Sequence, residues 1–469
     1  MWQPDLNAQR VGPLLFKLSF PAIAGMILYS MFSLVDTYFV ARLGSQALAA
    51  LTLSVPLQIL ISSLASASGT GLTSLISRTL GAGDGRMADN IAWHGLIIAV
   101  IYGVCFSLVG FYFLDPMLLL FGCTPDTFFL CREYLQIVLA GSVFTFLLII
   151  MENIMQGEGD TVMPMLVGLG GIILNVIFDP VFMFGLGPLP GMGMRGAAWA
   201  TVLSELLSTW LIFQIITRRR LLLAWKWAHF RPSLRVVKGV YAVGLPMLMA
   251  ELAWVFSMTV QNRLVAGYGY TAVAAIGIFL RVRSFCLTPV FGLAQAALPM
   301  AAFAHGAGSA ERVKETLVKS GVLGIFLLLA AVFFMQCHPD WIVGLFSKDP
   351  GLTETGISGL RLATLCFPLL SPIFMVSTVL QALGKGVKAM MMSMIRQLVL
   401  FLPLLLLLSR IWGLNGVWMA FSISEFLAGG LALVFAIDLW RELPGRRRVA
   451  RVVLLQPGYW LRRTLAWIK

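Results

Sequence analysis

Twelve long apolar segments dominate the chain, and short stretches rich in glycine, proline or charged residues separate them. They lie near residues 14–41, 47–77, 90–114, 134–156, 163–187, 196–217, 239–266, 272–303, 320–336, 359–381, 389–410 and 415–438. Since a helix needs about 20 mostly apolar residues to cross the hydrocarbon core of a membrane, each segment predicts one crossing. The pattern therefore predicts an all-α integral membrane protein with 12 transmembrane helices.

The composition excludes a water-soluble enzyme. Of the 469 residues, 59% are hydrophobic and 12% are charged, whereas a soluble domain has roughly 45–50% apolar and about 25% charged residues. The net charge of +13 does not indicate nucleic acid, because no segment resembles a nucleic-acid-binding module. We therefore expect membrane lipids as surroundings and no nucleic-acid partner.

The distribution of basic residues predicts the orientation. If the N-terminus is inside, 24 of the 34 lysines and arginines lie in inner segments and six in outer loops, and the other four lie within or at the edges of spans. Cytoplasmic loops of membrane proteins are enriched in these residues. We expect a multi-pass protein of the cytoplasmic (inner) membrane with both termini in the cytoplasm.

The chain repeats itself at an offset of 225 residues. Pro21 matches Pro246, and Gly81-Ala82-Gly83 matches Gly306-Ala307-Gly308; further on, at an offset of 220, GMRGAAWATVLSE matches GLNGVWMAFSISE. Six spans per half make this a parallel repeat, which predicts two homologous six-helix bundles with a central cleft between them. The predicted parts are an N-terminal lobe (1–217), a basic cytoplasmic linker (218–238), a C-terminal lobe (239–438) and a basic cytoplasmic tail (439–469).

The linker carries seven basic residues together with Trp225 and Trp227. This composition favours an amphipathic helix on the membrane surface that also acts as a topology signal. A regulatory lipid site is the alternative.

Ionisable residues at membrane depth are the main functional candidates, because burying a charge there is costly unless it is paired or hydrated. Asp36 lies within the first span, and its repeat partner is Gln261. Asn175 and Asp179, in NVIFDP of the fifth span, share one helical face at a spacing of four. These oxygen-bearing groups suit a sodium ion at Asp36, Asn175 and Asp179, or a carboxylate that carries a proton.

The second lobe offers fewer candidates. Glu251 in the seventh span could recognise a cation or carry a proton, or form a structural ion pair with Arg281. Glu205 and Glu425 occupy the same place in both halves, which favours a structural role for them. No cofactor motif is present, and the six cysteines show no zinc spacing, although Cys123 and Cys131 share one external loop and could form a disulfide.

The chain resembles the multidrug and toxic compound extrusion (MATE) family over roughly residues 14–438. The resemblance rests on the order of several motifs: LSFPAIAGMILYSMFSLVDTYFVARLGSQALAAL, LISRTLGAGD, QGEGDTVMPM, ILNVIFDP, GMRGAAWATVLSE, GLPMLMAELAWVF and QALGKG. It implies a V-shaped pair of bundles that exports cationic or amphipathic organic compounds, driven by inward flow of protons or sodium. Asp36, Asn175 and Asp179 match the coupling site of the first lobe in bacterial members, and Thr201 matches a hydroxyl residue of that cluster.

The sequence departs from the family pattern in the second lobe. Some branches carry an additional acid deep in the seventh or tenth span, whereas here the tenth has none and Glu251 lies close to Pro246. This departure puts a cation site in the second lobe in doubt.

The sequence leaves three other functions open. A flippase for lipid-linked or glycan precursors would favour a strongly cationic cleft, whereas four acids (Asp36, Glu152, Asp179, Glu251) lie near the spans. A membrane-embedded transferase would need a metal or nucleophile motif, which we do not find, so we expect no enzymatic activity. A passive channel is the third alternative. The best-supported expectation is a secondary antiporter that works as a monomer.

Overall fold

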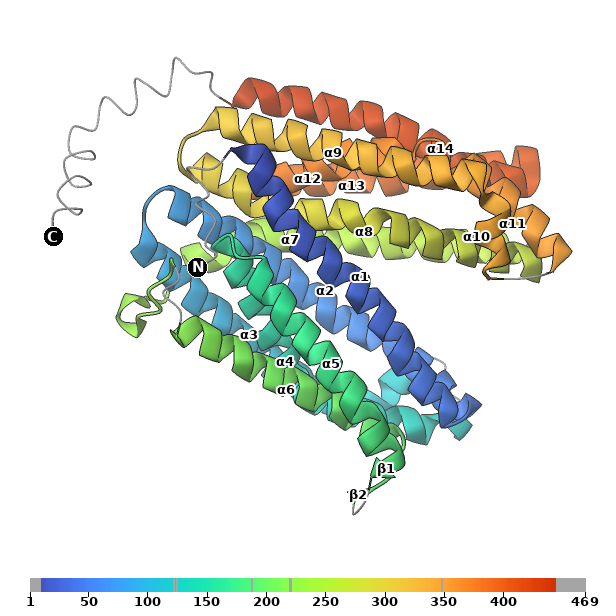
Figure 1. Ribbon diagram of the computed structural model, residues 1–469, viewed down its shortest axis with the longest axis horizontal. Coiled ribbons are helices and arrows are strands. Elements are labelled where there is room, and N and C mark those ends of the chain that lie inside the picture. The colour runs from blue at the N-terminus through green and yellow to red at the C-terminus, as the bar shows by residue number, and fades with distance from the viewer. Residues whose placement is uncertain are drawn as a thin grey trace.

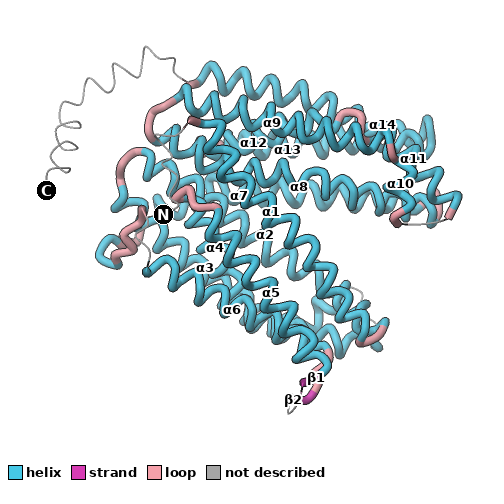
Figure 2. Tube along the Cα trace, in the orientation of Figure 1, coloured by secondary structure: helices cyan, strands magenta, loops and turns pink. Residues whose placement is uncertain are grey.

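The computed structural model is almost entirely helical and describes residues 10–120, 123, 125–186, 189–218, 222–346 and 349–443 (Figures 1 and 2). The first half forms α1 (Val11–Arg42), α2 (Ser45–Gly81), α3 (Gly85–Leu120), α4 (Pro125–Gly157), α5 (Val162–Phe184) and α6 (Met194–Arg218). Two short strands, β1 (Gly185–Leu186) and β2 (Leu189–Pro190), pair antiparallel between α5 and α6. Apart from this hairpin, the all-α prediction is confirmed for the described residues.

The second half is divided into more and shorter helical elements. It forms the 3₁₀ turn η1 (Trp227–His229), α7 (Leu234–Ala266), α8 (Tyr270–Gly306), α9 (Ala310–Cys337), α10 (Pro339–Gly344), α11 (Pro350–Ala363), the 3₁₀ turn η2 (Phe367–Leu369), α12 (Leu370–Ala382), α13 (Gly386–Met394), the π-helix η3 (Ile395–Phe401) and α14 (Leu402–Glu442).

Two breaks explain why the second half has more helical elements than predicted crossings. One bends the tenth crossing, and the other separates the eleventh crossing from the twelfth. The tenth is bent by 49° between α11 and the segment 367–382, next to Pro368, which cannot donate a backbone hydrogen bond. The continuous segment from Gly386 to Glu442 has 57 residues, which at about 1.5 Å per residue is far too long for one crossing. It turns at Gly413, whose φ of 58° favours glycine. With this turn, the described chain has twelve crossings, as predicted.

The helices form two bundles that lie close together at one end and diverge at the other (Figure 1). We call the end near the described N-terminus and the end of α14 the narrow end, and the opposite end, which carries the β1–β2 hairpin, the wide end. Helices α2 to α6 make up one bundle, and α8 to α14 the other (Figure 1). This arrangement agrees with the predicted pair of homologous bundles.

The first helix of each half crosses between the two cores. Val11, Leu14 and Leu18 at the start of α1 are buried in the same hydrophobic core as α8 and α14. Conversely, Val236 and Val240 at the start of α7 are buried in the core that α2, α3 and α4 form. The boundary at residue 239 predicted from sequence therefore does not separate the cores, because α7 begins at Leu234 and its first turns pack in the first lobe.

Glycines bring the lobes into backbone contact at the narrow end. A Cβ atom on Gly306 at the end of α8 would lie 1.9 Å from the carbonyl oxygen of Arg78 on α2. A Cβ atom on Gly81, its repeat partner, would lie 2.1 Å from the carbonyl oxygen of Phe303. Nearby, the Ser74 hydroxyl donates to the backbone carbonyl oxygen of Gln381 in the other lobe at 2.7 Å. Only glycine allows α2 and α8 to approach so closely.

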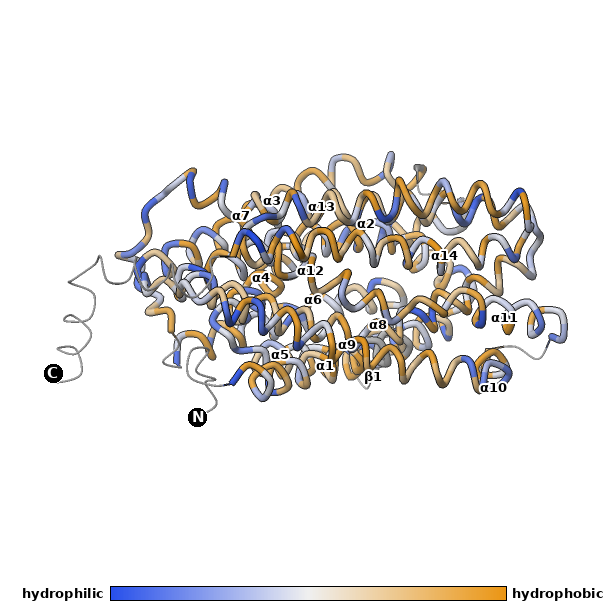
Figure 3. Tube along the Cα trace, turned by 90° about the horizontal axis from the view of Figure 1, so that it is seen from above, coloured by the Kyte–Doolittle hydropathy of each residue, from blue (hydrophilic) through white to orange (hydrophobic). Residues whose placement is uncertain are grey.

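Apolar residues dominate the helices along their length (Figure 3). Large apolar side chains are left exposed on the outside of the bundles, including Tyr112 at 81%, Phe333 at 72% and Phe16 at 63%. Such surface is unfavourable in water but matches the lipid hydrocarbon. The protein is therefore a multi-pass membrane protein.

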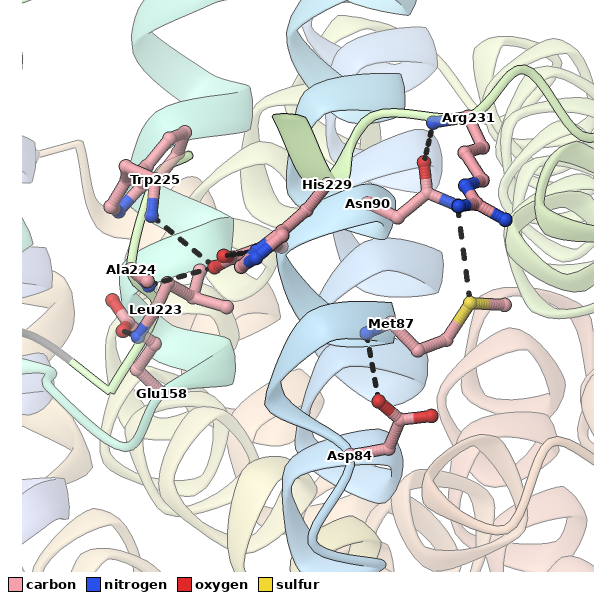
Figure 4. A network of polar contacts seen from close by, with 10 residues as sticks. Asp84, Met87, Asn90, Glu158, Leu223, Ala224, Trp225, His229 and Arg231 are labelled. Carbon is pink, nitrogen blue, oxygen red and sulfur yellow. Dashed lines mark hydrogen bonds and ion pairs between the residues drawn. The ribbon is translucent and has the colours of Figure 1, made fainter. Parts of the chain in front are cut away.

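The linker is docked on the first lobe and is not an amphipathic surface helix. Between α6 and α7, its described part holds only the three-residue turn η1. The side chain of Asp89 on α3 accepts hydrogen bonds there from the backbone of Ala224 at 2.8 Å and Trp225 at 3.3 Å. The same carboxylate contacts Nδ1 of His229 at 2.5 Å. Figure 4 shows Trp225, His229 and Arg231 along this docked segment, with Glu158 beside it. The prediction of a surface helix for this segment was wrong, because buried side chains accept hydrogen bonds from its backbone N–H groups.

Further contacts hold the linker at both of its ends. Oε1 of Glu158 accepts from the backbone of Leu223 at 2.7 Å, and Nε2 of His94 accepts from the backbone of Ser233 at 3.0 Å. Burial raises the pKa of Glu158 to about 8. The linker is thus attached to the first lobe up to the residue before α7.

Candidate functional site

A large cavity lies mainly within the first lobe. Its volume is about 680 Å³, and its lining comes from α1, α2, α4, α5 and α6, with Thr288 and Gln295 of α8 reaching it from the second lobe. Ligand sites for drug-sized molecules typically measure about 300–1,000 Å³. The cavity therefore has room for one organic compound of that size.

The cavity has an acidic lining. Asp36, Glu152 and Glu205 contribute carboxyl groups, and no lysine, arginine or histidine is among the described residues that line it. Its other surfaces combine apolar side chains such as Met26, Leu148 and Ile172 with amides and hydroxyls. An apolar chamber with carboxylates suits an amphipathic molecule that carries a positive charge.

Three of the residues predicted from sequence meet at one side of this cavity. The amide nitrogen of Asn175 donates to Oδ1 of Asp179 at 3.5 Å, because a spacing of four on α5 stacks the two side chains. Asp179 is fully buried, and its side chain lies within hydrogen-bonding reach of Asp36 on α1. Two carboxyl groups close together favour a shared proton or a bound cation, since like charges disfavour each other.

Oδ2 of Asp179 is buried and has no hydrogen-bond partner among the described side chains and backbone. A buried acceptor without a donor is costly, so this atom is available to a proton or a metal ion. Asp36 and Asp179 supply carboxylate oxygens and Asn175 an amide oxygen, the hard ligands that sodium prefers. No group of three or more His, Cys, Asp or Glu residues with metal-site geometry occurs in the described part of the chain.

Thr201, also predicted, lines the same cavity from α6, and its hydroxyl donates to the carbonyl oxygen of Ala197 at 3.1 Å. Glu152 was counted among the acids near the spans without a role, and Tyr134 and Gln58 were not predicted. All three line the cavity, and the Gln58 amide donates to the Tyr134 hydroxyl at 3.3 Å. An acid inside the apolar span 134–156 was the available signal for Glu152.

The two repeat-related glutamates have different surroundings. Glu205 lines the cavity and accepts from the Thr145 hydroxyl at 2.5 Å. Glu425 pairs with Arg283 and Arg396, each at 3.0 Å. Equal positions in the repeat therefore do not give these residues one common role.

Glu251 and Arg281 do not form the ion pair considered for them. Arg281 is exposed, and the Glu251 side chain lies within hydrogen-bonding reach of Ser63 on α2. Neither residue lines the acidic cavity. Cys123 and Cys131 are both free thiols.

A family model provides the identification. The model of the MatE family, the multidrug and toxic compound extrusion transporters, matches residues 21–181 and 246–407, once in each half of the repeat. The chain belongs to this family. The double match follows the duplicated fold, and the MATE resemblance found in the sequence is confirmed.

Curated relatives of this MATE protein cover nearly all of its length. An FAD transporter from Shewanella oneidensis is 28% identical over 424 residues, 89% of this chain and 93% of the relative. The multidrug export protein MepA from Staphylococcus aureus is 25% identical over 433 residues, 91% of this chain and 94% of the relative.

Solved MATE structures share the fold. A transporter of the MOP superfamily from Pyrococcus furiosus superposes with a TM-score of 0.87 at 27% identity, over 94% of this chain and 98% of that chain. A structure described as the outward-facing conformation of a multidrug resistance MATE family transporter gives the same values. These neighbours have the 12-helix, two-lobed architecture, so the predicted fold class is confirmed.

Proposed function

We propose that this protein is a secondary antiporter that exports cationic or amphipathic organic compounds in exchange for protons or sodium ions. The observation that carries the proposal is the cavity of about 680 Å³, whose described lining holds three carboxyl groups and no basic side chain. The MATE membership and the name of the MepA relative support export of drugs.

The coupling we propose centres on Asp36 and Asp179. These carboxyl groups lie on α1 and α5, which both line the cavity, so a proton or sodium ion bound between them reduces the negative charge that attracts a cationic cargo. By linkage, the cargo and the coupling ion must each lower the affinity for the other. Exchange follows when the ion binds on one side of the membrane and the cargo on the other.

We place the narrow end and both termini in the cytoplasm, because cytoplasmic segments are enriched in basic residues. The described basic segments include the end of α6 and the docked linker. In that orientation the bundles diverge toward the outside (Figure 1). A complete pair of lobes in one chain also supports a functional monomer in the cytoplasmic membrane. No catalytic role is part of the proposal.

An anionic cargo is the second candidate, because the Shewanella oneidensis relative is named an FAD transporter. A flippase for lipid-linked or glycan precursors would also carry anionic groups. Both call for basic side chains around the cargo, and the described lining of the large cavity has none. This difference favours a cationic cargo.

The test is uptake of a fluorescent organic cation into everted membrane vesicles with either an acidic interior or an internal sodium load. We expect one of the two gradients to drive uptake, and the Asp36→Asn variant to lose at least tenfold of it. Asp115→Asn is the matched control, because Asp115 is exposed and pairs with Arg132 at the surface. Wild-type uptake by Asp36→Asn would refute the coupling role, and uptake of FAD in place of the cation would refute the cargo class.

A further inference from the structure

The second lobe contains a buried cluster with an excess of positive charge. Oε1 of Glu425 on α14 accepts hydrogen bonds from Nη2 of Arg283 on α8 and from Nη1 of Arg396 on η3, both at 3.0 Å. The side chains of the two arginines are 12% and 11% exposed and that of Glu425 is 3% exposed. Two guanidinium groups thus share one carboxylate, which leaves one uncompensated positive charge at membrane depth.

A small cavity lies against this cluster. Its volume is about 20 Å³, enough for one water molecule or one monatomic ion, and Arg283, Arg396 and Glu425 all line it. Glu425 is the single carboxylate among the described lining residues. The charge that faces the cavity is therefore positive.

Several hydrogen-bond donors that line the cavity lack partners. Nε2 of Gln261, Oγ of Ser257 and Nε of Arg283 are buried and have no hydrogen-bond partner among the described residues. Gln261 is 3% and Ser257 is 2% exposed, and a spacing of four places both on one face of α7. Three unpaired donors beside an excess positive charge are costly in a membrane interior unless an acceptor occupies the cavity.

The repeat shows that this cluster corresponds to the acidic cavity of the first lobe with its charge reversed. At the offset of 225, Gln261 corresponds to Asp36 and Arg283 to Gln58; at 220, Glu425 corresponds to Glu205. The first-lobe partners all line the acidic cavity. A carboxylate has thus become an amide, and an amide a guanidinium, at equivalent positions.

The π-helix supplies the additional arginine. Arg396 and Gln397 are neighbours in the sequence, and both line the small cavity from η3. At either repeat offset the first lobe has Gly171 or Val176 in place of Arg396. Because π-helical turns are rare and often mark functional sites, this local geometry supports a ligand site.

We propose that this cavity binds a monatomic halide, chloride in the cell. Chloride accepts hydrogen bonds from all three unpaired donors and neutralises the excess charge. A monatomic anion suits a cavity of about 20 Å³, which holds about one water molecule. A water molecule is the competing occupant, since it can also bridge the donors to the unpaired Oε2 of Glu425, but it leaves the charge uncompensated.

The experiment compares thermal unfolding of the purified full-length protein in sodium chloride, bromide and gluconate at one ionic strength. A ligand that binds only the folded state raises the unfolding temperature with increasing concentration. We expect chloride and bromide to raise it in a saturable way and gluconate to have no such effect. Equal unfolding temperatures in all three salts would overturn the proposal and assign the cavity to water.

Variants locate the effect. Arg396→Met removes the excess charge and should abolish the halide-dependent shift, whereas Arg281→Met, at an exposed arginine on the same helix as Arg283, should retain it. Gln261→Leu changes no charge and should weaken the apparent halide affinity at least tenfold, which keeps the test decisive if Arg396→Met does not fold. A halide shift that persists in Gln261→Leu at wild-type affinity would contradict this location.

Bromide also provides a direct readout. In crystals grown with sodium bromide, we expect an anomalous peak between Arg283 and Arg396. A halide shift in solution without this peak would overturn the assignment of the site.

Discussion

The glycine contact at the narrow end predicts that a single methyl group can shift the equilibrium between conformations. In Gly306→Ala, the new Cβ atom would lie 1.9 Å from the Arg78 carbonyl oxygen and 2.9 Å from its Cα atom. These are backbone atoms of α2 in the other lobe, so they cannot rotate away as a flexible side chain would. The lobes must separate at this point, or the closed narrow end must bear the strain.

The magnitude follows from the cost of overpacking. An inserted methyl group in a tightly packed contact typically costs about 1–3 kcal/mol. The gain in helix propensity from glycine to alanine, at most about 1 kcal/mol, applies to both conformations of α8 and cancels between them. We therefore expect the population with a closed narrow end to fall by a factor of about 5–150 relative to the open one.

Thiol labelling measures this shift. Ser74 is fully buried at the narrow end, where its hydroxyl contacts the carbonyl oxygen of Gln381. In a background in which the six native cysteines are replaced, Ser74→Cys should react slowly with a membrane-impermeant reagent supplied from the narrow side. Adding Gly306→Ala should accelerate the reaction by the same factor of about 5–150.

Gly277→Ala is the matched control, because a Cβ atom at this position on α8 meets nothing within 4 Å. It should leave the labelling rate unchanged. If Gly306→Ala labels no faster than Gly277→Ala while both proteins remain folded, then α2 and α8 do not form a conformation-specific contact and the reasoning is wrong.

Three further predictions test the linker and the core. Burial raises the pKa of Glu158 from 4.5 to about 8, so the contribution of this residue to stability is complete below about pH 4 and is lost as the pH rises through about 8. Glu158→Gln should therefore reduce the pH dependence of the unfolding temperature between pH 5 and 9, and an unchanged pH profile would contradict this. Asp89→Ala leaves the donors of Ala224 and Trp225 unpaired, at about 1–3 kcal/mol each, and should speed proteolysis of the linker at least tenfold; wild-type cleavage would show that Asp89 does not hold it. Trp418 is fully buried, so Trp418→Ala should cost about 3–5 kcal/mol in the free energy of unfolding, and a loss under 1 kcal/mol would contradict its place in the core.

The crossings could be predicted from sequence because the thickness of the membrane fixes the length of an apolar run. The break at Gly413 was predicted, because it falls in the gap between the apolar segments 389–410 and 415–438. The bend at Pro368 could not be located, since this residue lies in a segment whose apolar pattern continues on both sides. The docked linker was missed for a related reason. Its conformation depends on Asp89, more than 130 residues away in the chain.

The candidate site was predictable where its members are local in sequence. Asn175 and Asp179 lie one turn apart, and an acid within an apolar span marks Asp36. The partners on α4 were not identified, because only tertiary packing shows that Tyr134 faces the cavity. The repeat predicted one structural role for both Glu205 and Glu425, but their neighbours differ. The role of a glutamate depends on the side chains around it and not on its position in the repeat.

The exchange of first helices between the lobes has a consequence for biogenesis. The start of α1 leaves the ribosome long before α8, yet its buried residues Val11 and Leu14 pack with α8, which is synthesised more than 250 residues later. Until then this part of α1 lacks its native apolar partners on α8. The first half cannot reach its native packing alone either, because its core includes Val236 and Val240 from the start of α7. The duplicated halves are thus obligate partners during membrane insertion, and the protein matures as one unit although its sequence is that of two.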